Sequence, residues 1–183
     1  MDKSPVIWFT GMSASGKSTL ANYLKDSLFK RGYKGTIIDG DTIRDRDKQK
    51  LSYGFNDVLT NNIRIASLCE EQRTTYDFVL VPVISPYEEV RKKVRKILEP
   101  NFHLVYLKSD ISSLKCRDPK GLYAAADRGE INDLIGYSAI NPYDEPVDPE
   151  LVVSTSSDIL VDDSFDVIFE YVNHFVFIDN YLF

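Results

Sequence analysis

The sequence has 183 residues, the usual length of one domain, and its composition excludes several classes of protein. Hydrophobic residues make up 43% and charged residues 27%, which is typical of a globular chain with a buried core and excludes extensive disorder. The formal net charge of −6 argues against a broad nucleic-acid-binding surface, because binding to a duplex depends on many Lys and Arg contacts to phosphate. Any anionic ligand must therefore be held by a local cluster of cations.

Sequence features of secreted and membrane proteins are missing. Residues 1–5 run directly into a strand-like segment without an apolar leader region, and no run of 18 apolar residues follows. Cys69 and Cys116 lack both the CxxC spacing and the additional ligands of a zinc site, so we interpret both as reduced thiols. These observations predict a cytoplasmic protein without a membrane span.

Apolar, β-branched runs alternate with helical patterns along most of the chain. Residues 6–10 form a continuous apolar run, which predicts a strand that is covered on both faces in a parallel sheet. Leucines recur at spacing four in the next segment, so a helix is expected from Lys17 to about Arg31. Further strands are expected at 36–38, 78–83, 104–107 and 151–153, and further helices at about 61–75 and 87–98. This alternation predicts a doubly wound α/β fold with a mainly parallel sheet.

Two segments depart from the alternation. Residues from about 115 to 148 are rich in Gly, Pro, Asp and Tyr and lack a clear period, which in a compact domain is typical of a functional lid. The aromatic-rich tail, about 164–183, is expected to form a helix and then an extension that packs on the core, although its rings would also suit a dimer contact. We therefore expect a single domain over 1–183 that carries a lid.

A glycine-containing loop follows the first predicted strand. Its residues 11–18, GMSASGKS, match the pattern GxxxxGK[ST] in full, and a predicted helix comes next. In this context the backbone N–H groups of the loop bind phosphate at a helix N-terminus. Lys17 is expected to reach the β- and γ-phosphates of ATP, and the Ser18 hydroxyl is expected to bind Mg²⁺. The predicted ATP-binding residues of this P-loop are Gly11, Ser13, Ala14, Ser15, Gly16, Lys17, Ser18 and Thr19.

A second polar group, DGDTIR at 39–44, follows the second predicted strand. Because the carboxyl ends of parallel strands meet at one edge of a sheet, this group should lie beside the P-loop. Phosphoryl transfer to a hydroxyl needs a carboxylate that orients or deprotonates the nucleophile, and cations that hold the transferring charge. Asp41 and Arg44 fit these roles, so the sequence predicts a P-loop kinase. Without the P-loop upstream, the same segment would more often be a simple turn.

Beyond these motifs, the chain resembles the adenylylsulfate kinases, which phosphorylate the 3′-hydroxyl of adenylyl sulfate. The resemblance covers about residues 5–155, and the pair ISPY and RDPKGLY makes it specific among P-loop proteins. It implies the three-layer fold of P-loop NTPases, ATP and Mg²⁺ as cofactors, and a homodimer. The matching stretches are VIWFTGMSASGKSTLA at 6–21, IDGDTIR at 38–44, GF at 54–55, NNIR at 61–64, ISPY at 84–87, R at 91, RDPKGLY at 117–123, GEI at 129–131 and YDEPVDPEL at 143–151.

The resemblance also implies roles for individual residues on both sides of the transfer. Asp41 would be the base or the substrate-orienting carboxylate, Lys120 would meet the anionic part of the acceptor, and Arg117 would lie against ATP. Ser85 matches a serine described in the family as a phosphoserine intermediate. Because direct in-line transfer makes that step unnecessary, we expect Ser85 to line the pocket instead. The other implied acceptor residues are Arg44, Phe55, Asn62, Ile84 and Leu134.

Two departures from the family pattern fall on the acceptor side. The family usually carries an Asp-Arg pair between the GF and NIR segments, whereas residues 56–61 read NDVLTN and lack that arginine. Leu134 stands where the family has a phenylalanine that packs against adenine. These changes leave the ATP machinery intact and keep two alternatives open. One is a 3′-kinase for another nucleotide, such as cytidine diphosphoramidate, and the other is a sensor that binds ATP without transferring phosphate.

Overall fold

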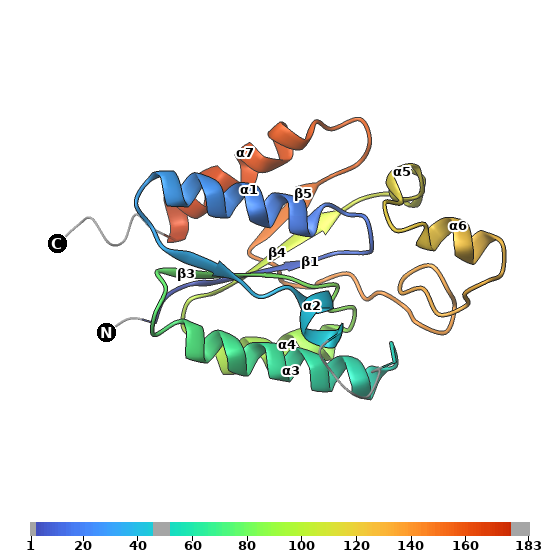
Figure 1. Cartoon of the computed structure of the whole chain (residues 1–183), viewed down its shortest axis with the longest axis horizontal. Coiled ribbons are helices and arrows are strands. Elements are labelled where there is room, and N and C mark those ends of the chain that lie inside the picture. The colour runs from blue at the N-terminus through green and yellow to red at the C-terminus, as the bar shows by residue number, and fades with distance from the viewer. Residues whose placement is uncertain (1–2, 46–51, 177–183) are drawn as a thin grey trace.

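The computed structural model describes residues 3–45 and 52–176, which form a parallel sheet between two layers of helices (Figure 1). Within these residues the strands are β1 (Val6–Thr10), β2 (Gly35–Ile37), β3 (Phe78–Pro82), β4 (Phe102–Lys108) and β5 (Leu151–Ser154), in the sheet order β2-β3-β1-β4-β5. The helices are α1 (Lys17–Lys30), α2 (Gly40–Asp45), α3 (Phe55–Gln72), α4 (Glu88–Leu98), α5 (Ile111–Arg117), α6 (Leu122–Asp127) and α7 (Val161–Tyr171). The strand pairs are parallel, so the predicted doubly wound α/β fold is confirmed.

The central strand β1 is buried on both faces, as its unbroken apolar run predicts. Val6 and Trp8 point to one face of the sheet and pack with residues of α3 and α4, whereas Ile7 and Phe9 point to the other face and pack with α1 and α7. Figure 1 shows α1 and α7 over one side of the sheet and α3 and α4 over the other. Burial of each such side chain stabilises the fold by about 1.5–3 kcal/mol. The three-layer architecture is therefore built around β1.

The carboxyl end of β1 lies where the chain changes direction across the sheet. From β1 the chain crosses to β2 at one edge and returns to β3 beside β1, whereas β4 and β5 follow on the other side of β1. The loops after β1, β2 and β3 consequently meet at one end of the sheet, where open α/β sheets bind their ligands. Figure 1 shows α2, α5 and α6 gathered at the same end.

Three short helices lie outside the elements that the sequence predicts. Helices α2 and α6 have six residues each and α5 has seven, which is too short for a helical period to stand out in the sequence. The 115–148 segment is thus less irregular than its composition suggests, because α6 and the end of α5 lie within it. Helix α3 begins at Phe55, earlier than the expected start near residue 61. The sequence pattern missed its first turns because polar residues such as Asn56 and Thr60 interrupt the apolar period there.

The C-terminal region is described as far as residue 176. Helix α7 begins at Val161, close to the expected start, and continues as a π-helix over Val172–Val176. The end of the predicted aromatic extension, residues 177–183, lies outside the described residues. Among the helices described, none combines the length and the hydropathy that crossing a bilayer requires.

Candidate active site

The P-loop curls between the end of β1 and the start of α1 in a conformation that glycine makes possible. Gly11 has φ of 153°, and a Cβ atom there would lie 2.7 Å from both the carbonyl oxygen of Leu107 and Oγ of Ser15. Ala14 has φ of 62°, a left-handed conformation that is costly for a residue with a side chain. Such strain concentrates at ligand-binding sites, so the geometry of the loop agrees with the phosphate-binding role that its sequence predicts.

Lys17 folds back onto the P-loop. Its Nζ donates hydrogen bonds to the carbonyl oxygens of Gly11 at 2.9 Å and Met12 at 2.8 Å, and Oγ of Ser15 lies 3.4 Å away. Burial of the amine lowers the pKa of Lys17 to about 8, against a smaller opposing effect of the Asp41 carboxylate. A negatively charged phosphate in the loop would favour the protonated amine and so oppose this lowering of the pKa.

Ser18 contacts the carboxylate of Asp39. The Ser18 hydroxyl donates to Oδ2 of Asp39 at 3.3 Å, while Oδ1 of Asp39 accepts from the backbone N–H groups of Asp41 at 2.9 Å and Thr42 at 3.1 Å. Asp39 thus fixes the start of α2 and faces the P-loop with its other oxygen. The sequence alone assigned no role to Asp39, although Asp is a favoured N-cap residue and follows a predicted strand here.

Three pockets follow one another along the carboxyl end of the sheet. The first, here called the Arg117 pocket, has a volume of about 380 Å³ and borders the P-loop at Ser15, Gly16 and Thr19. The second, the Lys17 pocket, has about 210 Å³ and is lined by Lys17, Ser18, Asp39, Asp41 and Lys120 among others. The third, the Arg44 pocket, has about 280 Å³ and includes Asp41, Arg44, Ile84, Lys120 and Leu134. Neighbouring pockets share lining residues, so the three lie side by side.

Arg117 forms a wall of the first pocket and is held by the chain around it. Its Nη2 donates to Oγ of Ser109 at 2.9 Å and to the carbonyl oxygen of Thr155, and its Nε donates to the carbonyl oxygen of Ser113 at 3.3 Å. These bonds tie the end of α5 to the segment after β5. The resemblance places Arg117 against ATP, and the structure sets it beside the P-loop residues Gly16 and Thr19.

Asp41 and Lys120 stand where the second and third pockets meet. Nζ of Lys120 lies 2.5 Å from Oδ2 of Asp41, which links the segment before α6 to α2. The hydrogen bond that Lys120 donates to Asp41 raises the pKa of Lys120 above its usual value. Both side chains line both pockets. A carboxylate at this junction faces the phosphate-binding loop on one side and the Arg44 pocket on the other.

The Arg44 pocket combines cations with an apolar wall. Nη1 of Arg44 donates to the carbonyl oxygen of Ser52 at 3.1 Å, and its guanidinium carbon lies 4.6 Å from the centre of the Tyr53 ring. Leu134 is nearly buried and belongs to an apolar cluster with Leu114 and Tyr123. The pocket is thus suited to a ligand with one anionic part and one flat, apolar part.

Three residues implied by the resemblance to contact the acceptor lie outside the lining of these three pockets. Phe55 packs its ring against Tyr87, with 5.2 Å between the ring centres. Asn62 is buried inside α3, where its Nδ2 donates to the carbonyl oxygen of Val58 at 2.9 Å. Ser85 is buried as well, and its Oγ has no hydrogen-bond partner among the described residues. Their contact with an acceptor therefore remains a prediction.

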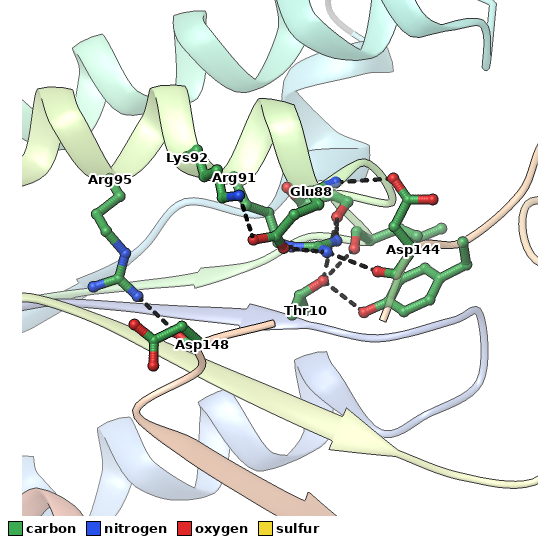
Figure 2. A network of polar contacts seen from close by, with 10 residues as sticks. Thr10, Glu88, Arg91, Lys92, Arg95, Asp144 and Asp148 are labelled. Atoms are coloured by element: carbon green, nitrogen blue, oxygen red, sulfur yellow. Dashed lines mark hydrogen bonds and ion pairs between the residues drawn. The ribbon is translucent and has the colours of Figure 1, made fainter. Parts of the chain in front are cut away.

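Arg91 holds the backbone next to Ile84 in place. This side chain is 2% exposed, and its Nη1 donates to the carbonyl oxygen of Ser85 at 2.7 Å. Its Nη2 donates to Oε2 of Glu88 and to the carbonyl oxygen of Asp144, each at 2.7 Å. Figure 2 shows Arg91 and Glu88 of α4 close to Asp144 from the segment that leads to β5. Ser85 has φ of 45°, so the network secures a strained turn.

Thr10 completes this network from the end of β1 (Figure 2). Its hydroxyl donates to the carbonyl oxygen of Ile84 at 2.6 Å and lies 2.9 Å from the hydroxyl of Tyr143. One wall of the Lys17 and Arg44 pockets is consequently fixed by side chains to which our sequence analysis gave no role. Several of their partners are backbone carbonyls of other segments, which no motif reveals.

The donor set near the P-loop fits Mg²⁺ held together with phosphate. Ser18 and Asp39 offer oxygen atoms, the ligand type that this ion prefers. Over residues 3–45 and 52–176 there is no cluster of three His, Cys, Asp or Glu side chains that would hold a metal ion. This arrangement matches the usual mode for Mg²⁺, which takes one or two protein ligands and completes its shell with substrate phosphates and water.

The fold and the site together define a P-loop kinase, because a phosphate-binding loop opens into a second pocket across a shared carboxylate. The sequence model of the adenylylsulphate kinase family matches residues 3–154, and the chain belongs to this family.

Similar proteins agree with this assignment. The adenylyl-sulfate kinase of Bacillus licheniformis is 43% identical over 159 residues, which cover 85% of this chain and 78% of that protein. The adenylyl-sulfate kinase of Prochlorococcus marinus is 41% identical, over 84% of this chain and 76% of that protein. Among solved structures, the APS kinase CysC of Mycobacterium tuberculosis in complex with AMPPNP and APS is 30% identical, with a TM-score of 0.81. The alignment covers 94% of this chain and 99% of that chain.

Proposed function

We propose that this chain transfers the γ-phosphoryl group of ATP to the 3′-hydroxyl of adenylyl sulfate, giving 3′-phosphoadenylyl sulfate. The observation that carries the proposal is the position of Asp41, which lines both the Lys17 pocket and the Arg44 pocket. A carboxylate at that junction can orient an acceptor hydroxyl towards the phosphate held by the P-loop. Curated relatives above 40% identity that carry this activity support the choice of acceptor.

On the ATP side, the triphosphate would lie along the P-loop, with its base and sugar towards the Arg117 pocket. The backbone N–H groups of the loop and the ammonium of Lys17 would bind the phosphates. Ser18 and Asp39 would hold Mg²⁺, which neutralises phosphate charge when it is bound with ATP. Arg117 would border the nucleotide from α5.

On the acceptor side, Arg44 and Lys120 supply two positive charges beside an apolar wall. These cations would bind the anionic phosphosulfate group, so the pocket offers charge even though residues 56–61 lack the arginine of the family pattern. Lys120 would leave its ion pair with Asp41 and bind the acceptor instead. The free carboxylate of Asp41 would then accept a hydrogen bond from the 3′-hydroxyl. The 115–148 segment carries Lys120 and Leu134, so its closure would also exclude water from the transfer.

A different nucleotide acceptor is the second candidate, and Leu134 is the observation that favours it. This leucine gives the Arg44 pocket an aliphatic wall where the family pattern has a phenylalanine. A smaller base, as in cytidine diphosphoramidate, would tolerate that change. A homodimer and a cytoplasmic location remain further proposals that rest on the family resemblance.

An assay of ADP release with ATP and Mg²⁺ separates these candidates. Adenylyl sulfate is compared with cytidine and uridine diphosphate analogues, and Lys17→Ala serves as the inactive control. The proposal predicts strong stimulation by adenylyl sulfate and its loss in Lys17→Ala. Stimulation by a cytidine compound alone would show that the acceptor is the different nucleotide of the second candidate. ATP binding without any stimulation would instead identify a sensor.

A further inference from the structure

The Arg44 pocket contains one aromatic ring among its described lining residues, and that ring belongs to Tyr53. The remaining walls are aliphatic or polar, and the neighbouring Phe55 packs its ring against Tyr87. The family resemblance does not single out Tyr53, because the matching stretch begins at Gly54. A nucleotide in this pocket would therefore find a flat apolar surface at Tyr53.

The guanidinium of Arg44 stacks on one face of the Tyr53 ring. The guanidinium carbon lies 4.6 Å from the ring centre, and Nη1 of the same arginine donates to the carbonyl oxygen of Ser52 at 3.1 Å. Such stacking is favourable because the ring face is electron-rich and the planar guanidinium is cationic. Tyr53 nevertheless keeps 40% of its surface exposed, so the ring still has surface for a ligand.

The backbone around Tyr53 is anchored on both sides. Oδ2 of Asp57 accepts hydrogen bonds from the backbone N–H of Ser52 at 2.8 Å and from its hydroxyl at 2.6 Å. The hydroxyl of Tyr87 donates to the carbonyl oxygen of Tyr53 at 3.3 Å. These contacts fix the turn that presents the ring, which reduces the entropy lost when a ligand stacks on it.

We propose that Tyr53 is the platform on which the base of the acceptor nucleotide stacks, with Arg44 supporting the opposite face of the ring. The inference rests on the proposed function, because it assumes a nucleotide acceptor in the Arg44 pocket. Stacking is tolerant of base identity, since every base has a flat face. Tyr53 therefore provides the flat surface that Leu134 does not, and the pocket accepts adenine without an aromatic residue at position 134.

Steady-state kinetics of Tyr53→Leu and Tyr53→Phe test this role. Loss of the ring in Tyr53→Leu is expected to raise the KM for adenylyl sulfate about tenfold, with the KM for ATP within about twofold of the wild-type value. Tyr53→Phe keeps the ring and is expected to behave almost like the wild type. Tyr23→Leu removes an exposed tyrosine of α1 and serves as the matched control. Adding Leu134→Phe to Tyr53→Leu should restore part of the affinity.

The outcomes distinguish this inference from the proposed function. Wild-type protein that does not turn over adenylyl sulfate contradicts the proposed function. Wild-type turnover with an unchanged acceptor KM in Tyr53→Leu overturns the role of Tyr53 alone, as does an equal loss in Tyr53→Phe. Calorimetric binding of adenylyl sulfate to the ADP complex repeats the comparison without catalysis. An acceptor affinity that is the same in wild type and Tyr53→Leu would also overturn the stacking role of Tyr53.

Discussion

Nζ of Lys120 and Oδ2 of Asp41 lie 2.5 Å apart, in an ion pair that joins the 115–148 segment to α2. The two side chains are 60% and 63% exposed, and ion pairs in such positions stabilise a protein by at most about 1 kcal/mol. The bond is consequently easy to exchange. An anionic acceptor that takes over Lys120 would release the Asp41 carboxylate to the acceptor hydroxyl.

Replacement of Asp41 by Asn should abolish most of the catalysis while leaving ATP binding intact. The amide keeps the shape of the side chain but is a poor proton acceptor, so kcat is expected to fall about 10²- to 10⁴-fold. The KM for ATP should change less than about threefold. Initial rates of ADP release at saturating acceptor measure both quantities. An Asp41→Asn variant with wild-type kcat would exclude Asp41 from the transfer.

Lys120→Ala should weaken binding of the acceptor and leave the stability of the fold almost unchanged. Loss of a charge-assisted contact to an anion is expected to raise the acceptor KM about tenfold or more, whereas the free energy of unfolding should change by less than about 1 kcal/mol. Lys30→Ala, at the far end of α1 from the P-loop, is the charge-matched control. Equal effects of the two substitutions on the acceptor KM would show that Lys120 acts only through net charge.

Arg91 is expected to stabilise the fold and not to take part in catalysis. Arg91→Ala leaves the carbonyl oxygens of Ser85 and Asp144 without their buried donor, so the free energy of unfolding should fall by about 2–4 kcal/mol. Lys92→Ala, next to it on α4 but 64% exposed at its side chain, should change it by less than about 0.5 kcal/mol. Urea denaturation of both variants gives the comparison. Similar small losses would mean that the network of Figure 2 is not stabilising.

The lowered pKa of Lys17 has a consequence for the dependence on pH. Its folded-state pKa of about 8 lies below the usual 10.5, so the unfolded chain binds more protons between these values. Without ligand, the contribution of Lys17 to stability is therefore constant below pH 8 and rises with pH from about 8 to 10.5. Phosphate favours the charged amine, so binding of ATP near pH 8 should take up a fraction of a proton.

Calorimetric titration with ATP in two buffers of different ionisation enthalpy measures that uptake. We expect about half a proton per ATP at pH 8. A titration at pH 6.5, where Lys17 is already charged, should show little uptake by this group and serves as the control. Equal uptake at both pH values would contradict the burial of the amine in the P-loop.

The two cysteines should report nucleotide binding without any mutation of the site. Cys116 is exposed and lines the Arg117 pocket, whereas Cys69 is buried and burial raises the pKa of its thiol to about 12. A thiol reagent should therefore modify one cysteine quickly in the native protein, because the thiolate is the reactive form. ATP with Mg²⁺ should slow that reaction. Fast labelling that ATP does not change would place the nucleotide elsewhere, and Cys116→Ser identifies the labelled residue.

Much of the fold follows from apolar periodicity, and the exceptions are short. The run at 6–10 predicted β1 because a strand buried on both faces needs an unbroken apolar sequence. The sequence pattern did not predict helix α2, because a single buried apolar side chain, Ile43, shows no helical period. Its start depends instead on the Asp39 carboxylate, which accepts two backbone hydrogen bonds.

The candidate site divides in a similar way. The P-loop, Asp41 and Arg44 could be placed at one sheet edge from motif and strand order, and the structure sets Asp41, Arg44 and Lys120 around one pocket. Sequence alone could not reveal Tyr53, whose proximity to Arg44 depends on how the turn before α3 packs. Nor could it reveal the function of Arg91, whose partners are mainly backbone atoms.

The phosphoryl transfer is tested most directly by identifying the product formed from ATP, Mg²⁺ and adenylyl sulfate. Mass spectrometry gives the number of phosphoryl groups in the product, and ³¹P NMR gives their positions. We predict one added phosphoryl group at the 3′-hydroxyl, formed by the wild type and lost in Asp41→Asn. Release of ADP with inorganic phosphate as the sole other product, or phosphorylation at another position, would contradict it.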